Sequence, residues 1–259
     1  METLPLPSFD RPFPRPRFKP TFEQRFDLRS FGEPIKALRA VPLRDEGEPL
    51  VDLRDACPAV VLHPGCLPFL RETVAHMVNQ VQASLPTDHV LTVGTALRTR
   101  EMQRGIRESF TREMTEKHPD WTKATMQRML NRMVAPPDDV SPPPHMTGGA
   151  LDVGVRGPDG KGLDFTSPSE GWIGAPTYYH KLSEIARNNR LLLIEAMENV
   201  GLTNYVGEWW HWSYGDQGWA LRVGHAVAFY DAVEIEDAES KRVPQPPKEE
   251  DPQPEEPTS

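Results

Sequence analysis

Proline places the strongest constraint on how this chain of 259 residues can fold, because many of its 28 prolines are gathered in clusters. Six lie in residues 1–20, and six follow Lys241, where they alternate with Gln, Glu and Lys. Proline lacks a backbone N–H donor, and segments this poor in apolar side chains cannot offset the entropy lost on ordering. We therefore expect a loose or extended segment over 1–20, one folded domain over 21–233 and a disordered acidic tail over 234–259.

The negative charge of the chain is concentrated in that tail. The formal net charge is −9, and residues 234–259 carry nine acidic and three basic side chains, which leaves the body nearly neutral. No basic stripe is dense enough to collect phosphates, so we expect no nucleic-acid partner. No apolar run approaches the ~20 residues of a membrane span, and no secretory signal is recognisable. The expected protein is soluble and cytoplasmic, and nothing in its sequence indicates an oligomeric state.

Helical periodicity appears in several stretches between the proline-rich ends. Apolar residues recur at helical spacing over residues 67–85, from Leu70 to Val81, which predicts an amphipathic helix. A charged stretch with one apolar face predicts a second helix that runs to about Lys117. Two further helical stretches are expected, over residues 121–133 and 177–200. The second is in one piece, or in two with a joint near Asn188-Asn189, and it ends at Gly201.

Strand patterns lie between these helices. Residues 89–96 are short and rich in branched side chains, residues 150–155 alternate apolar with polar or small residues, and residues 204–214 are crowded with aromatic residues and valine. A proline cluster over 136–144 forbids regular structure and leads directly into His145. Helices and strands are mixed without regular βαβ alternation. We therefore predict an α+β fold with a small, mainly antiparallel sheet flanked by helices.

Two short motifs contain residues suited to metal chemistry. His145 opens the run His-Met-Thr-Gly-Gly-Ala-Leu-Asp, which ends at Asp152, and two glycines within it allow a sharp turn. Glu208 and His211 open and close the run Glu-Trp-Trp-His. Two histidines, an aspartate and a spare glutamate are the inventory of a catalytic zinc site, with three protein ligands, an open position for water and a base beside it.

These motifs resemble those of the zinc D,D-peptidases. His145 and Asp152 fit the pattern His-x-x-Gly-x-Ala-x-Asp, and Glu208 and His211 fit Glu-x-Trp-His. The form Glu-Trp-Trp-His is most similar to the D-alanyl-D-alanine dipeptidase (VanX-like) family, and the resemblance covers roughly residues 60–230. It implies a Hedgehog/D,D-peptidase-like fold and one Zn²⁺ per chain, with the two histidines and the aspartate as ligands and the glutamate as catalytic base.

Two further residues follow from the resemblance alone. The family places an arginine between a strand and a helix, usually within Tyr-Arg-Pro, and Arg98 has that place here although both of its neighbours differ. Arg98 would then stabilise the oxyanion, with Arg100 as the alternative. The family also holds the ammonium group of the substrate with an acidic residue after the metal-binding strand. Glu170 has that place, with Asp164 as the fallback.

The expected reaction is zinc-dependent hydrolysis of the small dipeptide D-Ala-D-Ala, within peptidoglycan metabolism of the cell wall. Zinc can lower the pKa of its water from 15.7 to about 7, and Glu208 would take the proton and pass it to the leaving amine. One alternative is a D,D-carboxypeptidase acting on peptidoglycan stem peptides, which the lack of an export signal disfavours. Another is a non-catalytic, zinc-stabilised binding protein of the same fold, which has no need of a base at Glu208.

The spacing of the second motif sets a geometric requirement. Glu208 and His211 are three residues apart, so on a straight strand they would face opposite sides of the sheet. We therefore predict a bulge, a bend or a strand end between them. Most aromatic residues in this region should pack in the core, and at most two should line the substrate pocket; the residues concerned are Trp209, Trp210, Trp212, Tyr214 and Trp219.

Overall fold

A computed structural model describes residues 32–137, 140–169 and 171–235 of the chain. The predicted segment 1–20, the start of the predicted domain at residue 21 and most of the predicted tail 234–259 lie outside these residues. Within them the fold is α+β, as predicted, with a five-stranded sheet and a separate two-stranded sheet.

The larger sheet has the order β2-β4-β5-β7-β6, and all of its neighbours are antiparallel except β2 and β4. The smaller sheet pairs β1 with β3 in antiparallel fashion. In chain order the strands are β1 (Leu50–Asp52), β2 (Val61–Leu62), β3 (Phe69–Arg71), β4 (Val90–Thr95), β5 (Ala150–Arg156), β6 (Thr203–Asn204) and β7 (His211–Ser213).

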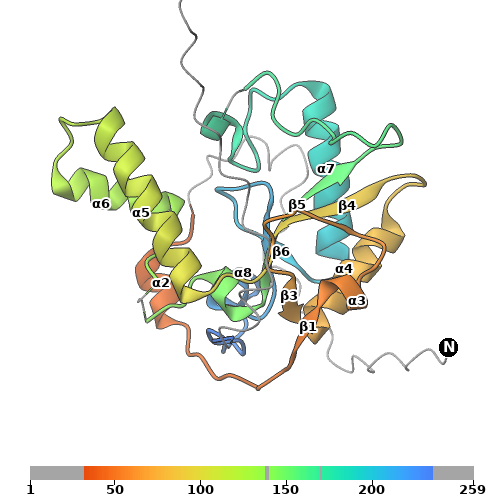
Figure 1. Cartoon of the computed structure of the whole chain (residues 1–259), viewed down its shortest axis with the longest axis horizontal. Coiled ribbons are helices and arrows are strands. Elements are labelled where there is room, and N and C mark those ends of the chain that lie inside the picture. The colour runs from red at the N-terminus through yellow and green to blue at the C-terminus, as the bar shows by residue number, and fades with distance from the viewer. Residues whose placement is uncertain (1–31, 138–139, 170, 236–259) are drawn as a thin grey trace, which may run out of the picture.

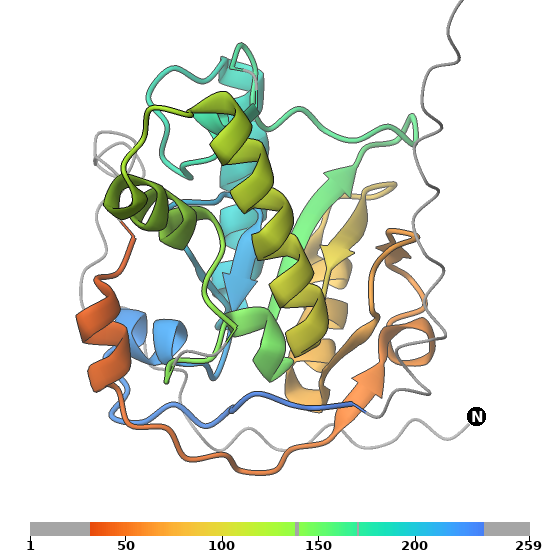
Figure 2. The same ribbon diagram turned by 60° about the vertical axis from the view of Figure 1, so that its left-hand side comes forward.

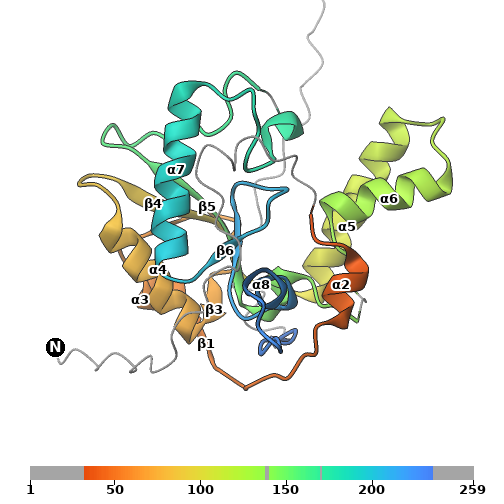
Figure 3. The ribbon, with the colours of Figure 1, turned by 180° about the vertical axis from the view of Figure 1, so that it is seen from behind.

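Helices surround the larger sheet unevenly. They are α2 (Ile35–Ala40), α3 (Leu53–Ala56), α4 (Glu72–Ser84), α5 (Arg100–Lys117), α6 (Lys123–Met133), α7 (Glu184–Asn199) and α8 (Gln217–Val223), with 3-10 turns η1 (Pro144–Thr147) and η2 (Gly171–Gly174). Seen from behind, α4 and α7 lie across one face of the sheet (Figure 3). α5 and α6 form a hairpin that extends to one side of the body (Figure 1), and α2 packs against α8 (Figure 2). No helix in the described ranges is both long and apolar enough to span a membrane.

Side-chain alternation along β5 gives the sheet two different faces. Leu151, Val153 and Val155 are buried in the core, which they share with α4 and α7. Asp152 lies between two of them in sequence, so its side chain points to the opposite face. The core therefore fills one face of the sheet and leaves the other free to carry polar groups.

The start of α7 is where the helix prediction is wrong. The pattern predicted helix over 177–200, but α7 begins at Glu184, where the Ser183 side chain caps the N–H of Ala186. Of the two alternatives left open, the helix is in one piece, because it continues through Asn188 and Asn189. The preceding loop is instead held by Arg190, which donates to the carbonyl oxygens of Phe165, Gly174, Pro176 and Thr177. These contacts join residues that are far apart in the sequence, so helical periodicity cannot predict them.

Smaller differences have local causes. The helix expected from residue 67 begins at Glu72, because residues 69–71 pair with β1. The proline cluster over 136–144 does not exclude all regular structure, since η1 begins at Pro144; proline suits a first helical position because its missing N–H would be unpaired there. Gly201 follows α7 with φ +93°, as predicted for the residue that ends the helix.

The two ends of the described chain lie together. Leu43 and Ala228 form a parallel bridge, the N–H of Arg44 donates to the carbonyl oxygen of Ala228, and the N–H of Glu46 donates to that of Phe229. The N–H of Val233 donates to the carbonyl oxygen of Met146 within η1. The N-terminal arm (residues 42–50) and the C-terminal strap (residues 228–233) therefore both lie close to the turn that carries His145.

Candidate metal centre and its pocket

Three side chains from separate elements converge on the polar face of the sheet. Asp152 on β5 and His211 on β7 are direct partners in the antiparallel register, so their side chains share a face. His145 reaches the same place from η1. Its Nε2 lies 3.1 Å from Asp152 Oδ1 and 3.1 Å from His211 Nδ1, and the last two atoms are 3.0 Å apart. Among the described residues this is the one group of His, Cys, Asp and Glu side chains arranged to hold a metal ion.

The glycines after His145 make this approach possible. Gly148 has φ +70°, and a Cβ on it would come within 2.6 Å of Leu50 Cδ2. A Cβ on Gly149 would collide with the carbonyl oxygen of Tyr214. Only glycine fits both conditions, so the Gly-Gly pair allows η1 to turn directly into β5.

Hydrogen bonding fixes which nitrogen of His145 faces the centre. Its Nδ1 lies 2.9 Å from the carbonyl oxygen of Ala96, which can only accept, so Nδ1 carries the proton and Nε2 presents a lone pair. Burial lowers the pKa of His145 to about 4, which keeps the ring neutral. Burial alone would raise the pKa of Asp152, but the two imidazoles beside it outweigh burial and hold that pKa well below its usual range, with His211 Nδ1 as the hydrogen-bond donor.

These atoms fit a divalent metal ion. His145 Nε2 and Asp152 Oδ1 present lone pairs to each other across 3.1 Å, an arrangement that a cation between them resolves. Ligand atoms that surround zinc tetrahedrally at 2.0–2.1 Å lie about 3.3 Å apart, close to the spacing here. Two imidazole nitrogens and one carboxylate oxygen are also the donor types of catalytic zinc sites.

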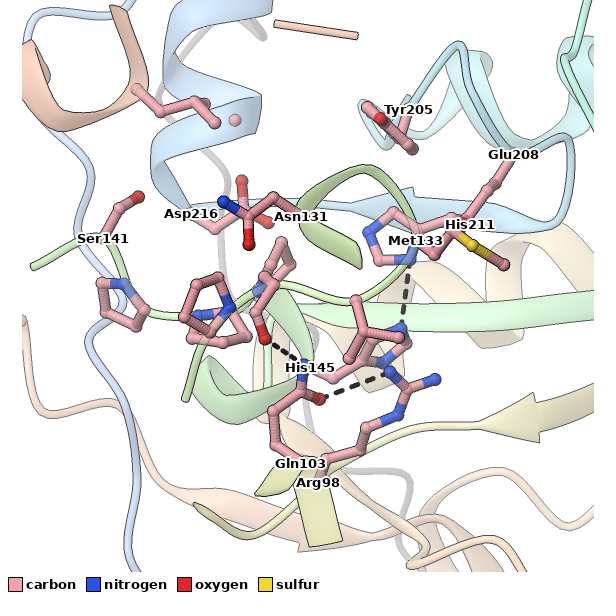
Figure 4. A pocket seen from close by; sticks show the side chains of 18 of the residues that line it. Arg98, Gln103, Asn131, Met133, Ser141, His145, Tyr205, Glu208, His211 and Asp216 are labelled. Carbon is pink, nitrogen blue, oxygen red and sulfur yellow. Dashed lines mark hydrogen bonds between the residues drawn. The ribbon is translucent and has the colours of Figure 1, made fainter. Parts of the chain in front are cut away.

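Arg98 lies beside this group, and Arg100 does not. Arg98 Nη2 donates to Asp152 Oδ2 over 3.2 Å, and its backbone N–H donates to the carbonyl oxygen of His145. Its Nη1 lies 3.5 Å from Gln103 Oε1 (Figure 4). Arg100 instead contacts Glu234 and the carbonyl oxygen of Pro137, and it is not among the residues that line the pocket.

Glu208 lies in the turn that precedes β7, as the geometric requirement predicted. Its N–H donates to the carbonyl oxygen of Tyr205, and its own carbonyl oxygen accepts from the N–H of His211. The strand begins only at His211, so the two side chains need not point to opposite faces. Glu208 lines the pocket (Figure 4), and burial raises the pKa of its carboxyl to about 7.

The residue expected to hold the ammonium group of the substrate is not placed. Glu170 lies outside the described residues. Its fallback, Asp164, accepts the N–H groups of Thr166 and Ser167 through Oδ1 and is not among the residues that line the pocket. Asp164 thus caps a turn.

The pocket has a volume of about 260 Å³. Its lining includes the proposed metal group and Glu208, together with Ile106, Phe110 and Met133 of the helical hairpin. Of the five aromatic residues considered above only Trp210 lines it, which agrees with the prediction; Trp172 joins it, and Trp172 contacts both Phe110 and Trp210 edge to face.

Sequence reasoning missed two groups in this pocket. Gln103 is 2% exposed, contacts Arg98 and donates to the carbonyl oxygen of Ala135. A signal for it existed, because it is a polar residue on the apolar stripe of α5. The ion pair between Glu33 and Arg222 (3.0 Å) also lines the pocket, and its residues are 189 positions apart, so no local pattern predicts it.

Two buried imidazoles and a carboxylate, with a second carboxylate in the same small pocket, are side chains of the kinds that metal-dependent hydrolases use. Comparison with known proteins narrows the class. Residues 104–229 match the peptidase family M15 model, described as D-ala-D-ala dipeptidase. The chain is 27% identical over 248 residues to the D-alanyl-D-alanine dipeptidase of Synechocystis sp. (strain ATCC 27184 / PCC 6803 / Kazusa), across 79% of this chain and 100% of that protein. Over these residues the chain is similar to D-alanyl-D-alanine dipeptidases.

Proposed function

We propose that this chain hydrolyses D-Ala-D-Ala with one Zn²⁺ held by His145, Asp152 and His211 and with Glu208 as general base. The observation that carries the proposal is the meeting of the three ligand atoms within 3.1 Å of one another in a pocket that Glu208 also lines. The family match supports the substrate class, because both the family description and the Synechocystis relative name D-Ala-D-Ala dipeptidases.

The metal and the base divide the chemistry between them. When bound, Zn²⁺ polarises the scissile carbonyl and lowers the pKa of a water molecule from 15.7 to about 7. Glu208 takes the proton of the attacking water and delivers it to the departing amine nitrogen. A carboxyl whose pKa is raised to about 7 by burial accepts and releases a proton readily near neutral pH, and such catalysis typically contributes 10²–10⁴-fold.

Arg98 supplies a fixed positive charge at the same centre. Its bond to Asp152 Oδ2 orients the carboxylate whose other oxygen faces the metal position. The same bond holds the guanidinium in place, so its remaining N–H donors can stabilise the oxyanion that forms on the carbonyl. A well-placed donor of this kind lowers the activation barrier by about 3 to 4 kcal/mol. We keep Glu170 as the proposed partner of the substrate ammonium, on the resemblance to the family.

The decisive experiment measures turnover and metal content together. Purified full-length protein is stripped of metal, reloaded with Zn²⁺ and assayed for D-Ala release from D-Ala-D-Ala. Glu208→Gln should lose about 10³-fold in kcat while it binds the same amount of zinc, because the base is removed and the ligands stay. Glu195→Gln, an exposed change on α7, is the matched control and should behave as wild type.

Three results would contradict the proposal in different ways. Release of D-Ala only from a stem pentapeptide would indicate a carboxypeptidase. Zinc-loaded wild-type protein that hydrolyses no D,D-dipeptide would indicate a binding protein. A Glu208→Gln variant with wild-type turnover would remove the base assignment alone and leave the substrate assignment standing.

A further inference from the structure

A buried arginine outside the pocket connects the turn that carries His145 to both ends of the described chain. Arg71, the last residue of β3, is 3% exposed. Burying a guanidinium is costly unless its N–H groups find acceptors. Arg71 finds carbonyl oxygens in three distant segments: Nε donates to Thr147 (2.9 Å), Nη1 to Glu48 and Nη2 to Asp231 (3.2 Å).

The contacts of Arg71 meet the chain immediately after the metal ligand. Besides the bond from Nε to Thr147, the backbone N–H of Arg71 donates to the carbonyl oxygen of Gly148 over 2.9 Å. On its other side, the His145 ring is fixed through Nδ1 to the carbonyl oxygen of Ala96. The turn is therefore held at two places: the His145 ring bonds to Ala96, the residue after β4, and the carbonyl groups of residues 147 and 148 bond to Arg71.

Arg71 and its neighbours also contact the N-terminal arm and the C-terminal strap. The guanidinium carbon of Arg71 lies 5.0 Å from the centre of the Tyr230 ring, and Nη2 lies 3.5 Å from Asp45 Oδ1. The Tyr230 hydroxyl and the backbone N–H of Thr73 both donate to the Glu48 carboxylate. All of these residues lie outside the range 104–229 that matches the family model. The support is thus built by parts of the chain that flank the matched region.

We propose that Arg71 is a positioning residue for the metal ligand His145. It touches neither the metal position nor the substrate pocket. It acts by fixing the carbonyl groups of residues 147 and 148, and so limits where the imidazole can move. Without Arg71 the carbonyl groups of residues 147 and 148 are no longer fixed, and the His145 ring can move. The three ligand atoms are then less often close enough together to bind one metal ion, so the metal binds more weakly. The inference rests on the metal-binding function proposed above.

The test is zinc affinity of the full-length protein in competition with a chromophoric chelator, alongside thermal unfolding of the metal-free form. Arg71→Lys keeps the charge but cannot reach three carbonyl oxygens from one ammonium group. It should weaken zinc binding by about 10- to 100-fold, the range seen when supporting residues of metal ligands are lost. It should also lower the Tm.

Arg190→Lys is the matched control. Arg190 is 1% exposed and likewise donates to carbonyl oxygens, but the loop it holds carries none of the three ligands. This variant should lower the Tm and leave zinc affinity at the wild-type value. A loss of affinity specific to Arg71→Lys separates positioning from a general loss of stability.

Each outcome bears on one proposal. Wild-type affinity in Arg71→Lys, or an equal loss in Arg190→Lys, would overturn the positioning role. A wild-type protein that binds no zinc would overturn the proposed function instead. Should Arg71→Lys not fold, Tyr230→Phe keeps the arginine and removes the hydroxyl that fixes Glu48. A loss of about threefold in zinc affinity is then expected for one hydrogen bond, and unchanged affinity would overturn the inference.

Discussion

The wall that carries the three proposed metal ligands and the wall formed by α5 and α6 face the same pocket, yet they are built differently. His145 is 4% exposed and His211 is 7% exposed, and the neighbouring Leu151 and Trp212 are fully buried in the core. In the hairpin only Gln103 and Leu130 are buried among the described side chains of both helices. Metal ligands need positions fixed to a fraction of an ångström, whereas a surface that only shapes a pocket tolerates more movement. We therefore expect changes on the first wall to alter chemistry and stability, and changes on the second to alter substrate affinity.

The largest effect should come from Asp152→Ala on the first wall. It removes one of the three proposed ligands and the acceptor that orients Arg98, so zinc affinity should fall by more than about 100-fold, beyond the loss typical of supporting residues. D-Ala release should fall to background. Asp159→Asn, in the exposed turn after β5, is the control. Retained zinc binding in Asp152→Ala would show that this wall does not hold the metal.

Next in size is the difference in stability between the two walls. Leu151→Ala removes a fully buried side chain from β5 and should lower the free energy of unfolding by about 2–5 kcal/mol. Ile106→Ala on α5 removes a partly exposed side chain and should cost less than about 1.5 kcal/mol. Urea unfolding of the metal-free proteins measures both. Equal losses would mean that the walls do not differ in packing.

The smallest effect should come from Trp172→Ala. Trp172 is 47% exposed and contacts Phe110 and Trp210, so it shapes the pocket without supporting the metal ligands. KM for D-Ala-D-Ala should rise about tenfold, the size expected for a lost apolar contact with substrate, while zinc affinity stays constant. Zinc titration and steady-state kinetics on the same samples check this. A fall in zinc affinity with constant KM would show that Trp172 supports the proposed metal centre and does not shape the substrate pocket.

Local patterns sufficed for much of this architecture. The 3.6-residue periodicity predicted both ends of α6 to within two residues, because the apolar residues of the buried helix face recur at that spacing in the sequence. Alternation of apolar with polar or small residues located β5 in the same way. The three-residue spacing of Glu208 and His211 predicted a bulge, a bend or a strand end between them, and the strand begins at His211. The two motifs also indicated which side chains the structure brings together at the proposed metal centre.

Contacts between distant segments were beyond such reasoning. The loop before α7 looks helical in sequence, yet its backbone oxygens bind Arg190, which is 13 or more residues away. Arg71 appeared only as one more residue of a predicted helix, since its acceptors lie 23, 76 and 160 positions away. A buried charged residue gives no periodic signal, because its contacts depend on the tertiary fold and not on the residues next to it in the sequence.

The pairing of the arm with the strap has a consequence for synthesis on the ribosome. Leu43 is made early, but its partner Ala228 and the Val233 that bonds to Met146 are among the last described residues to leave the exit tunnel. A nascent chain can form α4 and β4 long before then, but it cannot yet form the contacts of the strap with the arm and with η1. Maturation of the proposed metal site should therefore wait until residue 233 has left the ribosome, after all three proposed ligands have been made.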